Sequence, residues 1–291
     1  MKLSVFFDTT KNDGGAYHQN IKTVELLNNI KNIELTIISP NEKTINFFKA
    51  KNIRTVIYHF NFIDRFFYFV YSSNFLKLFF KKINLTNKFE KFLKKNQINL
   101  IYFISNSRAS IFCSKVNFFS YIYEIHHLFR PDLPEYKGWH DFDLREQIIQ
   151  NTIKKASLIF VDTKKKKNDL VKYYNCYEEK VEIIPLIPNI TIHNEENYQN
   201  KDLEKFINEK DDYYFYPAQY WPHKNHKYLI DVFKILIHEK KKNIRLILTG
   251  TQKLNFEFLQ KTVNESNLQE KIKFFKYLEN EDIVQLYKNT K

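Results

Sequence analysis

A polar cluster of mixed chemistry lies in the stretch YYFYPAQYWPHKNHK, from Tyr213 to Lys227: His223, Lys224, Asn225 and His226. The stretch begins with an apolar run, which predicts a strand, and continues through a turn rich in proline and aromatic residues. Apolar residues then recur at about helical spacing from Leu229 to Ile237, so Lys224 is expected at or near the first turn of a helix. A helix N-terminus beside a lysine favours a bound phosphate.

A second candidate is the glycine pair Gly14-Gly15, which follows the apolar run Leu3 to Phe7 and precedes a helical pattern. Backbone N–H groups can approach a phosphate closely where no Cβ intervenes. Half of the 4 glycines in the chain lie in this one loop. An ordinary tight turn between strand and helix has the same sequence, so both interpretations stay open.

Two histidines, His126 and His127, follow an expected strand from Ser120 to Ile125. Open α/β sheets bind ligands at the carboxyl ends of their strands, and a neutral imidazole can exchange hydrogen bonds with hydroxyl groups. Either histidine could equally be a surface residue. Arg145 and Glu146, farther along, are interpreted as structural residues at the start of a helix that Asp141 and Asp143 cap. No metal site is assigned.

The formal charge of +13, from 46 Lys and Arg against 33 Asp and Glu, admits anionic partners such as nucleotides or phospholipid head groups. The excess is mostly lysine, which an A+T-rich coding sequence also produces without functional pressure. No nucleic-acid-binding motif is present, so no nucleic-acid partner is expected. Cys113 and Cys176 form no disulfide framework or zinc motif, which suits a reducing cytosol. The sequence has no signal peptide and no apolar run of about 18 residues, so we expect a cytoplasmic protein, soluble or peripheral at the inner face of the membrane.

The order of elements predicts an α/β fold with a mostly parallel sheet covered on both faces. Helical segments separate most of the expected strands, which are Leu3 to Phe7, Ile33 to Ile38, Arg54 to Tyr58, Leu100 to Ile104, Ser120 to Ile125, Leu158 to Val161 and Val181 to Ile184.

A change of composition after residue 187 predicts a domain boundary. Residues 1–187 form the expected first domain, and the polar residues 188–212 an expected linker with a charged helix. Residues 213–291 supply three further strand–helix units, with strands at Tyr213 to Tyr216, Arg245 to Leu248 and Lys271 to Phe275. A complete nucleotide-binding half has about five or six strands, so we expect this domain to be incomplete and the chain to be truncated.

Aromatic residues and lysines interleave from Phe60 to Lys95, as in FFYFVYSSNFLKLFFKK and KFEKFLKK. A segment at a membrane surface has this composition, with Phe and Leu inward and Lys toward acidic head groups. A helix that packs in the core and has lysines along its exposed edges has the same amino-acid composition. Both interpretations remain open, and the first would favour a lipid-linked acceptor.

The chain resembles the GT-B glycosyltransferases of family 4 over most of its length. In order and spacing, YPAQYWPHKNHKYLIDVF, LILTG and KIKFFKYLENEDIVQLYKN look like the donor-binding domain of these enzymes. Upstream, YEIHHLFRPDLPEY, DLREQIIQNTIKKASLIFVDT and DLVKYYNCYEEKVEIIPL resemble the second half of their N-terminal domain. The most specific of these matches is PAQYWPHKNH.

The resemblance implies two Rossmann-like domains facing a cleft and transfer of a hexose from a nucleotide-sugar donor. The acceptor would be a glycan or lipid-linked molecule in cell-envelope polysaccharide assembly. Such enzymes are usually retaining and need no metal or other cofactor, because cationic groups and helix N-termini stabilise the departing diphosphate.

Site residues follow from the same resemblance. Lys224 matches the lysine that pairs with the donor phosphates, Gly14 and Gly15 match the loop facing those phosphates, and His127 matches a histidine that contacts the donor sugar. Many relatives have an arginine where this chain has Gln219, and more often an aspartate where it has Glu124. The remaining residues expected in the donor pocket are His223, Asn225, Gly250, Lys276 and Tyr277.

The glutamate pair by which the family holds the donor ribose and sugar would follow the helix that ends near Lys288. Its absence from the sequence leaves a second hypothesis: a catalytically impaired remnant that acts as a nucleotide-sugar-binding or partner-binding module.

Overall fold

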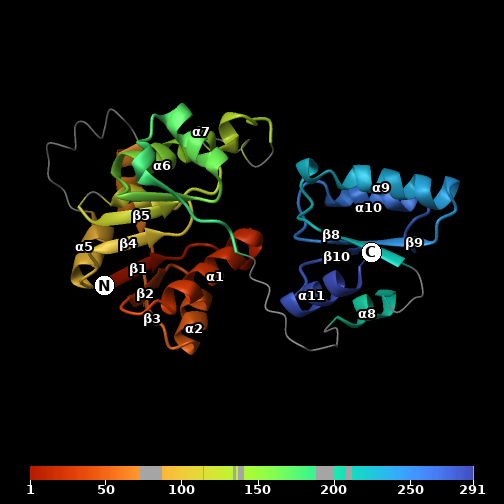
Figure 1. Ribbon diagram of the computed structural model, residues 1–291, viewed down its shortest axis with the longest axis horizontal. Helices are drawn as coiled ribbons and strands as arrows, with labels where there is room; N and C mark the ends of the chain where they lie inside the picture. The colour runs from red at the N-terminus through yellow and green to blue at the C-terminus, as the bar shows by residue number, and fades with distance from the viewer. Residues whose placement is uncertain are drawn as a thin grey trace. The chain divides into compact units, whose positions relative to one another are not determined.

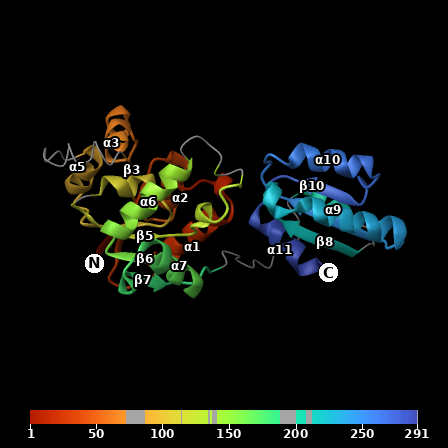
Figure 2. The same cartoon turned by 90° about the horizontal axis from the view of Figure 1, so that it is seen from above.

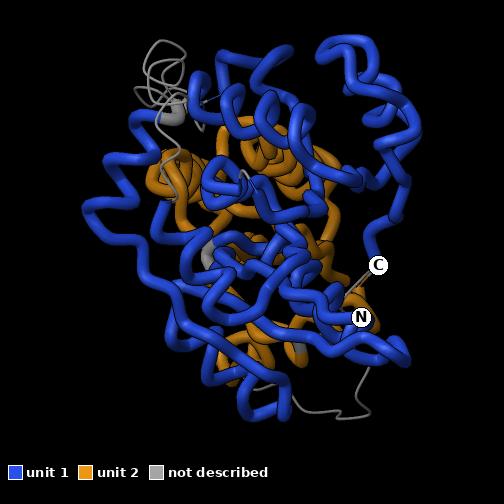
Figure 3. The backbone as a smooth tube through the Cα atoms, turned by 90° about the vertical axis from the view of Figure 1, so that its left-hand side faces the viewer, with its two compact units in different colours: residues 1–189 blue, residues 190–291 orange. Residues whose placement is uncertain are grey.

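The computed structural model describes residues 1–72, 87–113, 115–133, 136, 141–187, 200–207 and 212–290. The chain divides into two compact units, residues 1–189 and 190–291, which are coloured separately in Figure 3. Each unit contains its own parallel sheet.

Within its described residues, the first unit has a seven-stranded parallel sheet in the order β3-β2-β1-β4-β5-β6-β7. Val5 on the central strand aligns with Ile37 of β2 and with Tyr102 of β4. The chain therefore builds outward from β1 in one direction and then, from β4, in the other. The strands are β1 (Lys2–Phe6), β2 (Glu34–Ser39), β3 (Arg54–Ile57), β4 (Leu100–Phe103), β5 (Asn117–Tyr121), β6 (Leu158–Val161) and β7 (Val181–Ile183).

Near-continuous apolar runs form these strands because both faces of the sheet are buried. Successive residues point to opposite faces, so Val5 and Phe6 enter two different cores, and both are fully buried. Helices α1 (Gly15–Asn28) and α2 (Glu42–Ala50) cover the Val5 face. The Phe6 face is covered by α3 (Phe62–Ser72), α5 (Lys88–Lys95), α6 (Asp141–Lys155) and α7 (Lys164–Tyr174), as Figure 1 and Figure 2 show.

Short polar side chains set several helix starts. The side-chain oxygens of Asn41, Asn87 and Thr163 accept backbone N–H groups at the N-termini of α2, α5 and α7. Asn175, in the left-handed conformation, ends α7. Single turns of 3-10 helix lie in the connections: η1 (Lys11–Asp13), η2 (Arg108–Phe112), η3 (His126–Leu128) and η5 (Glu178–Lys180).

The second unit is a three-stranded parallel sheet, among its described residues, in the order β10-β9-β8. Its strands are β8 (Asp212–Pro217), β9 (Ile244–Thr249) and β10 (Ile272–Phe275). One face packs on α9 (His226–Lys234), which continues as the π-helical turn η7 (Ile235–Glu239), and on α10 (Phe256–Glu265). The other face packs on α8 (Lys201–Ile207) and α11 (Asn280–Asn289) (Figure 1).

The α/β class and the parallel sheets predicted from the sequence are confirmed. One strand boundary was wrong: β5 runs from Asn117 to Tyr121, not from Ser120 to Ile125. Phe118 and Ser120 already alternate into the buried interior, and after Ile122 pairs with Phe160 the chain turns into η3. The histidines still follow the carboxyl end of this strand.

Part of the aromatic and lysine-rich stretch from Phe60 to Lys95, residues 73–86, lies outside the described residues. In the described part of the chain, every helix is too short or too polar to cross a bilayer.

We predict that α8, which falls in the segment expected to be a linker, stabilises the second unit. Leu203 is fully buried against the sheet, so Leu203→Ala should lower the unfolding free energy of this unit by about 2–5 kcal/mol in denaturant titrations. Lys205→Ala changes an exposed residue of the same helix and should stay within about 0.5 kcal/mol of the parent. Equal midpoints for the parent and Leu203→Ala would show that α8 contributes nothing to the core.

Candidate functional site

The first unit has a topological switch point between β1 and β4, where the order of building reverses. Asp8 follows β1 and Ser105 follows β4, and the Ser105 hydroxyl donates a 2.8 Å hydrogen bond to Asp8 Oδ1. Burial is the main cause that raises the pKa of the Asp8 carboxyl above its ordinary value, whereas hydrogen bonds from Ser107 and Ser105 oppose the rise. A carboxyl group and two hydroxyls thus meet where open α/β sheets bind ligands, and the sequence analysis missed all three.

Gly14 and Gly15 lie at the same edge and have different roles. Gly14 joins η1 to α1 with φ of +60°, a conformation that favours glycine. Gly15 is the first residue of α1, and a Cβ placed there meets nothing within 4 Å. The loop is closed by Asp13, whose Oδ2 accepts the Thr10 N–H at 2.7 Å and the Thr10 hydroxyl at 3.0 Å. Only Gly14 is therefore required by the backbone itself.

A buried asparagine ties α1 to this edge. Asn20 Nδ2 donates to Thr9 Oγ1 at 3.0 Å, and the Tyr123 hydroxyl donates to Asn20 Oδ1 at 2.7 Å. Thr9 follows β1, and Tyr123 follows β5. The bonds therefore fix the start of α1 relative to two strand ends.

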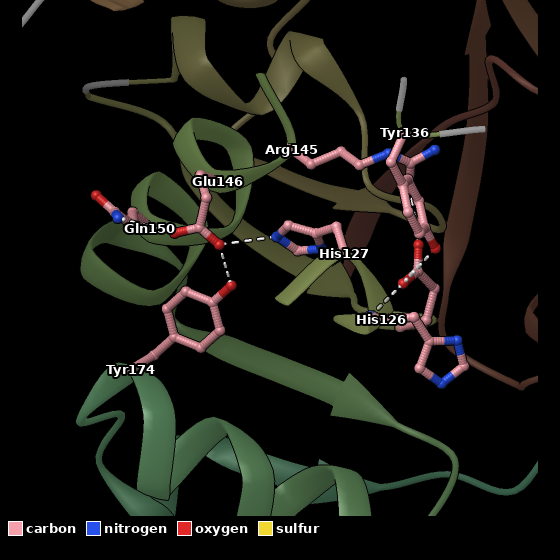
Figure 4. A network of polar contacts seen from close by, with 8 residues as sticks. His126, His127, Tyr136, Arg145, Glu146, Gln150 and Tyr174 are labelled. Atoms are coloured by element: carbon pink, nitrogen blue, oxygen red, sulfur yellow. Dashed lines mark hydrogen bonds and ion pairs between the residues drawn. The ribbon is translucent and has the colours of Figure 1, made fainter. Parts of the chain in front are cut away.

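His127 is fully buried, and its Nε2 lies 2.8 Å from Glu146 Oε1 (Figure 4). The Glu146 carboxylate also accepts hydrogen bonds from the Tyr174 hydroxyl and from Gln150 Nε2, the latter at 3.0 Å. An ionised carboxylate only accepts, so the bond places the proton of a neutral His127 on Nε2. The other ring nitrogen, Nδ1, is buried and has no hydrogen-bond partner among the described residues. We call these four residues the His127 cluster.

His126 differs from its neighbour, since its side chain is exposed and points away from Glu146 in Figure 4. Its backbone N–H donates to Glu124 Oε2 at 2.6 Å. Glu124 Oε1 accepts from Arg145 at 2.9 Å, and the Arg145 guanidinium lies 4.8 Å from the centre of the Tyr136 ring. Arg145 and Glu146, interpreted from the sequence as structural, thus hold both sides of the two-histidine turn.

In the second unit, Lys224 is exposed and ends the single 3-10 turn η6 (Pro222–Lys224). Asn225, in the left-handed conformation with φ of +53°, separates this turn from α9. The Tyr216 hydroxyl donates to the Lys224 carbonyl at 3.0 Å, so the backbone of the turn is held while the ammonium group projects outward. His223 is also exposed and stacks on the Trp221 ring.

Gly250 allows the loops after β8 and β9 to touch. A Cβ on Gly250 would lie 2.7 Å from the Ala218 carbonyl carbon and 2.9 Å from the Gln219 Cα. Ala218 N–H donates to the Thr249 carbonyl at 2.9 Å, and Gln219 Oε1 accepts from Trp221 Nε1 at 2.9 Å. Gln219 is thus committed to orienting Trp221.

His226 belongs to the interior of this loop. It is fully buried between the rings of Tyr216 and Tyr220, and its Nε2 lies 3.2 Å from the Ala218 carbonyl oxygen. Burial lowers the pKa of His226 below its ordinary value of 6.5, the hydrogen bond to Ala218 opposes this, and the Lys224 charge adds to the lowering. His226 is therefore a neutral structural residue beneath the polar turn.

Lys276 and Tyr277 follow β10, at the same edge of the sheet as Gln219 and Gly250. The Thr249 hydroxyl donates to the Lys276 carbonyl at 2.5 Å, while the Lys276 side chain is exposed and Tyr277 is half-buried. The structure thus gathers the residues that the sequence analysis expected in a donor pocket at the carboxyl ends of the three strands of this unit. In the described residues of both units, no group of three or more His, Cys, Asp or Glu side chains could hold a metal ion.

Residues 197–291 match the model of the family described as glycosyl transferases group 1. The second unit thus resembles the glycosyl transferases group 1 family. No curated protein sequence matched the chain.

Several solved structures resemble the whole chain in fold. Anabaena HepE, in complex with UDP and glucose, has a TM-score of 0.67 at 13% identity, with 100% of this chain and 72% of HepE covered. WaaG, a glycosyltransferase involved in lipopolysaccharide biosynthesis, has a TM-score of 0.59 at 13% identity, with 100% of this chain and 73% of WaaG covered. A putative UDP-N-acetylglucosamine 2-epimerase from Listeria monocytogenes has a TM-score of 0.58 at 11% identity, with 100% of this chain and 72% of the epimerase covered. The chain has the GT-B fold.

We predict that Gly250→Ala destabilises the second unit by about 1–3 kcal/mol, because backbone atoms of Ala218 and Gln219 would have to move. Gly15→Ala is the matched control: its Cβ enters open space at a helical position, and stability should be equal or higher by up to about 1 kcal/mol. Thermal unfolding of both variants measures the difference. If Gly250→Ala melts with the parent, the close approach of the two loops is not a constraint.

The lowered pKa of His226 predicts a pH dependence of stability. The unfolded chain binds a proton near pH 6.5 that buried His226 resists, so stability is fully present above that pH and falls as the pH drops below it. Urea unfolding between about pH 7.5 and 5 should show a smaller loss for His226→Gln than for the parent. His223→Gln removes an exposed histidine and should leave the loss unchanged. The same pH profile in the parent and His226→Gln would contradict the assignment.

Proposed function

We propose that this protein transfers a sugar, a hexose, from a nucleotide-sugar donor to a glycan or lipid-linked acceptor. The observation that supports this most is the match of residues 197–291 to the glycosyl transferases group 1 model. The fold alone would not distinguish a transferase from an epimerase, since structures of both kinds resemble the chain. HepE is solved with UDP and glucose, which makes a UDP-sugar the first donor to test.

Lys224 is the proposed phosphate ligand. Its exposed ammonium group makes no ion pair within the described residues, and the backbone of its turn is held by Tyr216. As the bond between sugar and diphosphate breaks, the diphosphate takes the electron pair, and a fixed cation stabilises the added charge. Gly14 and Gly15 are proposed as the phosphate-facing loop of the first unit; because the Gly14 N–H donates to the Lys11 carbonyl at 3.1 Å, the Gly15 N–H at the first turn of α1 is the proposed donor. His223, Asn225, Gln219, Gly250, Lys276 and Tyr277 complete the proposed donor pocket.

His127 is proposed to contact the donor sugar. Nε2 is engaged with Glu146, so the other ring nitrogen, the buried Nδ1 without a hydrogen-bond partner among the described residues, is the atom proposed to bond a sugar hydroxyl. Tyr174 and Gln150 hold the Glu146 carboxylate in turn. The cluster would therefore orient the sugar through a ring whose tautomer and angle are fixed.

We further propose a retaining reaction that uses no metal or other cofactor, placed in cell-envelope polysaccharide assembly in the cytoplasm. WaaG, which resembles the chain in fold, acts in lipopolysaccharide biosynthesis. A lipid-linked acceptor would require peripheral contact with an anionic membrane at its inner face. The exposed phenylalanines of α3, Phe62, Phe66 and Phe69, support such a contact.

We predict that Lys224→Ala weakens binding of UDP about tenfold or more, because a charge-assisted contact to phosphate is lost. Isothermal titration with UDP, GDP and dTDP measures the effect and identifies the base. Lys227→Ala is the matched control, since Lys227 carries the same charge three residues away and pairs with Asp231 at 2.6 Å.

The two variants separate a local contact from a general charge effect. Equal weakening by Lys224→Ala and Lys227→Ala would remove Lys224 from the site. Transfer assays with UDP-glucose on the parent then separate the two functional hypotheses: turnover supports the transferase, and UDP binding without turnover favours a binding module.

A further inference from the structure

A cavity of about 240 Å³ lies between α3 and η2 in the first unit. Its described lining residues are Phe60, Asp64, Arg65, Tyr68, Arg108 and Phe112. Arg108 directly follows Ser107, which hydrogen-bonds Asp8 at the switch point between β1 and β4. The cavity is therefore close to the edge of the sheet that carries the candidate site.

Aromatic rings form the walls and are anchored in the core. Phe60 stacks on Phe112 with ring centres 5.7 Å apart, and Tyr68 meets Phe112 at 6.3 Å. Phe112 belongs to the buried core on the Phe6 face, and Phe60 and Tyr68 pack against it. Because these rings are held by the core, the hollow is part of the folded unit.

The polar groups of the cavity favour an anion. The Tyr68 hydroxyl is buried and has no hydrogen-bond partner among the described residues. Burial raises the pKa of Tyr68 and the nearby Arg108 charge lowers it, so the guanidinium is close to the hydroxyl. Within the same residues, the exposed guanidinium groups of Arg65 and Arg108 form no ion pair.

Asp64 also lines the cavity but is committed elsewhere. Its Oδ2 accepts the Tyr58 hydroxyl at 2.9 Å and the Asn61 N–H at 3.0 Å, as a cap on the first turn of α3. With two guanidinium groups and one carboxylate, the described lining of the cavity has a net positive charge. A ligand with one negative group beside an apolar body suits this arrangement.

The outer surface of α3 extends the apolar character beyond the cavity. Phe62 and Phe69 are 83% and 63% exposed, which is unusual for phenylalanine and for a helix that also packs on the core. Helix α5 lies beside α3 and contacts it (Figure 2). It carries four exposed lysines, Lys88, Lys91, Lys94 and Lys95. Apolar rings beside cationic side chains match the boundary between hydrocarbon and anionic head groups.

We propose that this cavity binds the phosphate end of a lipid phosphate, with the hydrocarbon chain leading out along the exposed phenylalanines of α3. Arg65, Arg108 and the Tyr68 hydroxyl bind the phosphate oxygens, and Phe60 and Phe112 enclose the first carbons. The volume is below the roughly 300 Å³ of pockets that enclose a drug-sized molecule, so only one end of a longer ligand fits. This inference deepens the proposed function, because it specifies the acceptor as a lipid-linked phosphate.

Farnesyl phosphate is a suitable probe, tested by isothermal titration below its micellar concentration and without any nucleotide. We expect saturable binding of farnesyl phosphate, at least tenfold weaker binding of farnesol, and no measurable binding of inorganic phosphate. Equal binding of farnesol would overturn the proposal, because it would show that the phosphate group contributes nothing. Tight binding of inorganic phosphate would also overturn it, because it would show that the hydrocarbon chain is not needed.

Substitutions at the cavity give the second part of the test. Arg65→Gln and Arg108→Gln should each weaken farnesyl phosphate about tenfold, and Tyr68→Phe, which removes one hydroxyl from a packed ring, about threefold or more. Arg54→Gln is the control, because it removes the same charge from an exposed residue that pairs with Glu34 at 3.6 Å. If Arg54→Gln weakens binding as much as Arg108→Gln, only net charge matters and the site is wrong.

Two further measurements separate the lipid source and the proposed function. Vesicles of phosphatidylglycerol should not displace farnesyl phosphate; complete displacement would make the surface a general lipid contact and overturn the acceptor assignment. Lys224→Ala should bind farnesyl phosphate like the parent. Loss of UDP binding without loss of farnesyl phosphate binding then identifies a failure of one site only.

Discussion

Parallel strand pairing is the constraint on which the rest of this molecule depends. Parallel neighbours require crossover connections, so every strand of a unit ends at the same edge of its sheet. In the first unit this gathers Asp8, Ser105 and the histidine turn near the β1–β4 junction, and in the second it gathers Gln219, Gly250 and Lys276. Asp8 and Ser105, which are 97 positions apart in the sequence, become hydrogen-bond partners through this rule. The chemistry of each edge is therefore a product of topology first and of local sequence second.

Local sequence was sufficient where one segment supplies both the element and its polar residues. The strands, the Gly14 turn and the Lys224 turn follow from short runs and turn residues. β5 was misplaced because apolar residues continue beyond its end at Tyr121, to Ile122 and Ile125. The partners of His127 could not be predicted in this way. Glu146, on α6, lies 19 positions after His127, which it contacts, and Tyr174, on α7, lies 28 positions after Glu146, to which it donates. Nothing in the neighbouring sequence distinguishes either residue from an ordinary helix residue. Sequence reasoning found the elements and missed the contacts between them.

The two histidine environments show how the protein separates structure from chemistry. His226 is enclosed by tyrosine rings and bonded to a carbonyl, which keeps it neutral and turns it into a support for the exposed Lys224 turn. His127 is equally buried, but a carboxylate fixes one nitrogen and leaves the other without a partner among the described residues. The sequence presents both simply as members of histidine-containing clusters. What distinguishes them is the acceptor that each ring faces, a property only the folded chain has.

The contact at Gly250 has a consequence for how such a domain can diversify. Because the loops after β8 and β9 touch through a position without a side chain, neither can shift its backbone alone. Insertions or larger residues in one loop would have to be matched by changes in the other within the same lineage. Variation is easier at positions whose side chains project from the joined loops, such as the exposed His223. Over evolutionary time, ligand preference in this domain should therefore drift through surface substitutions on a fixed pair of loops.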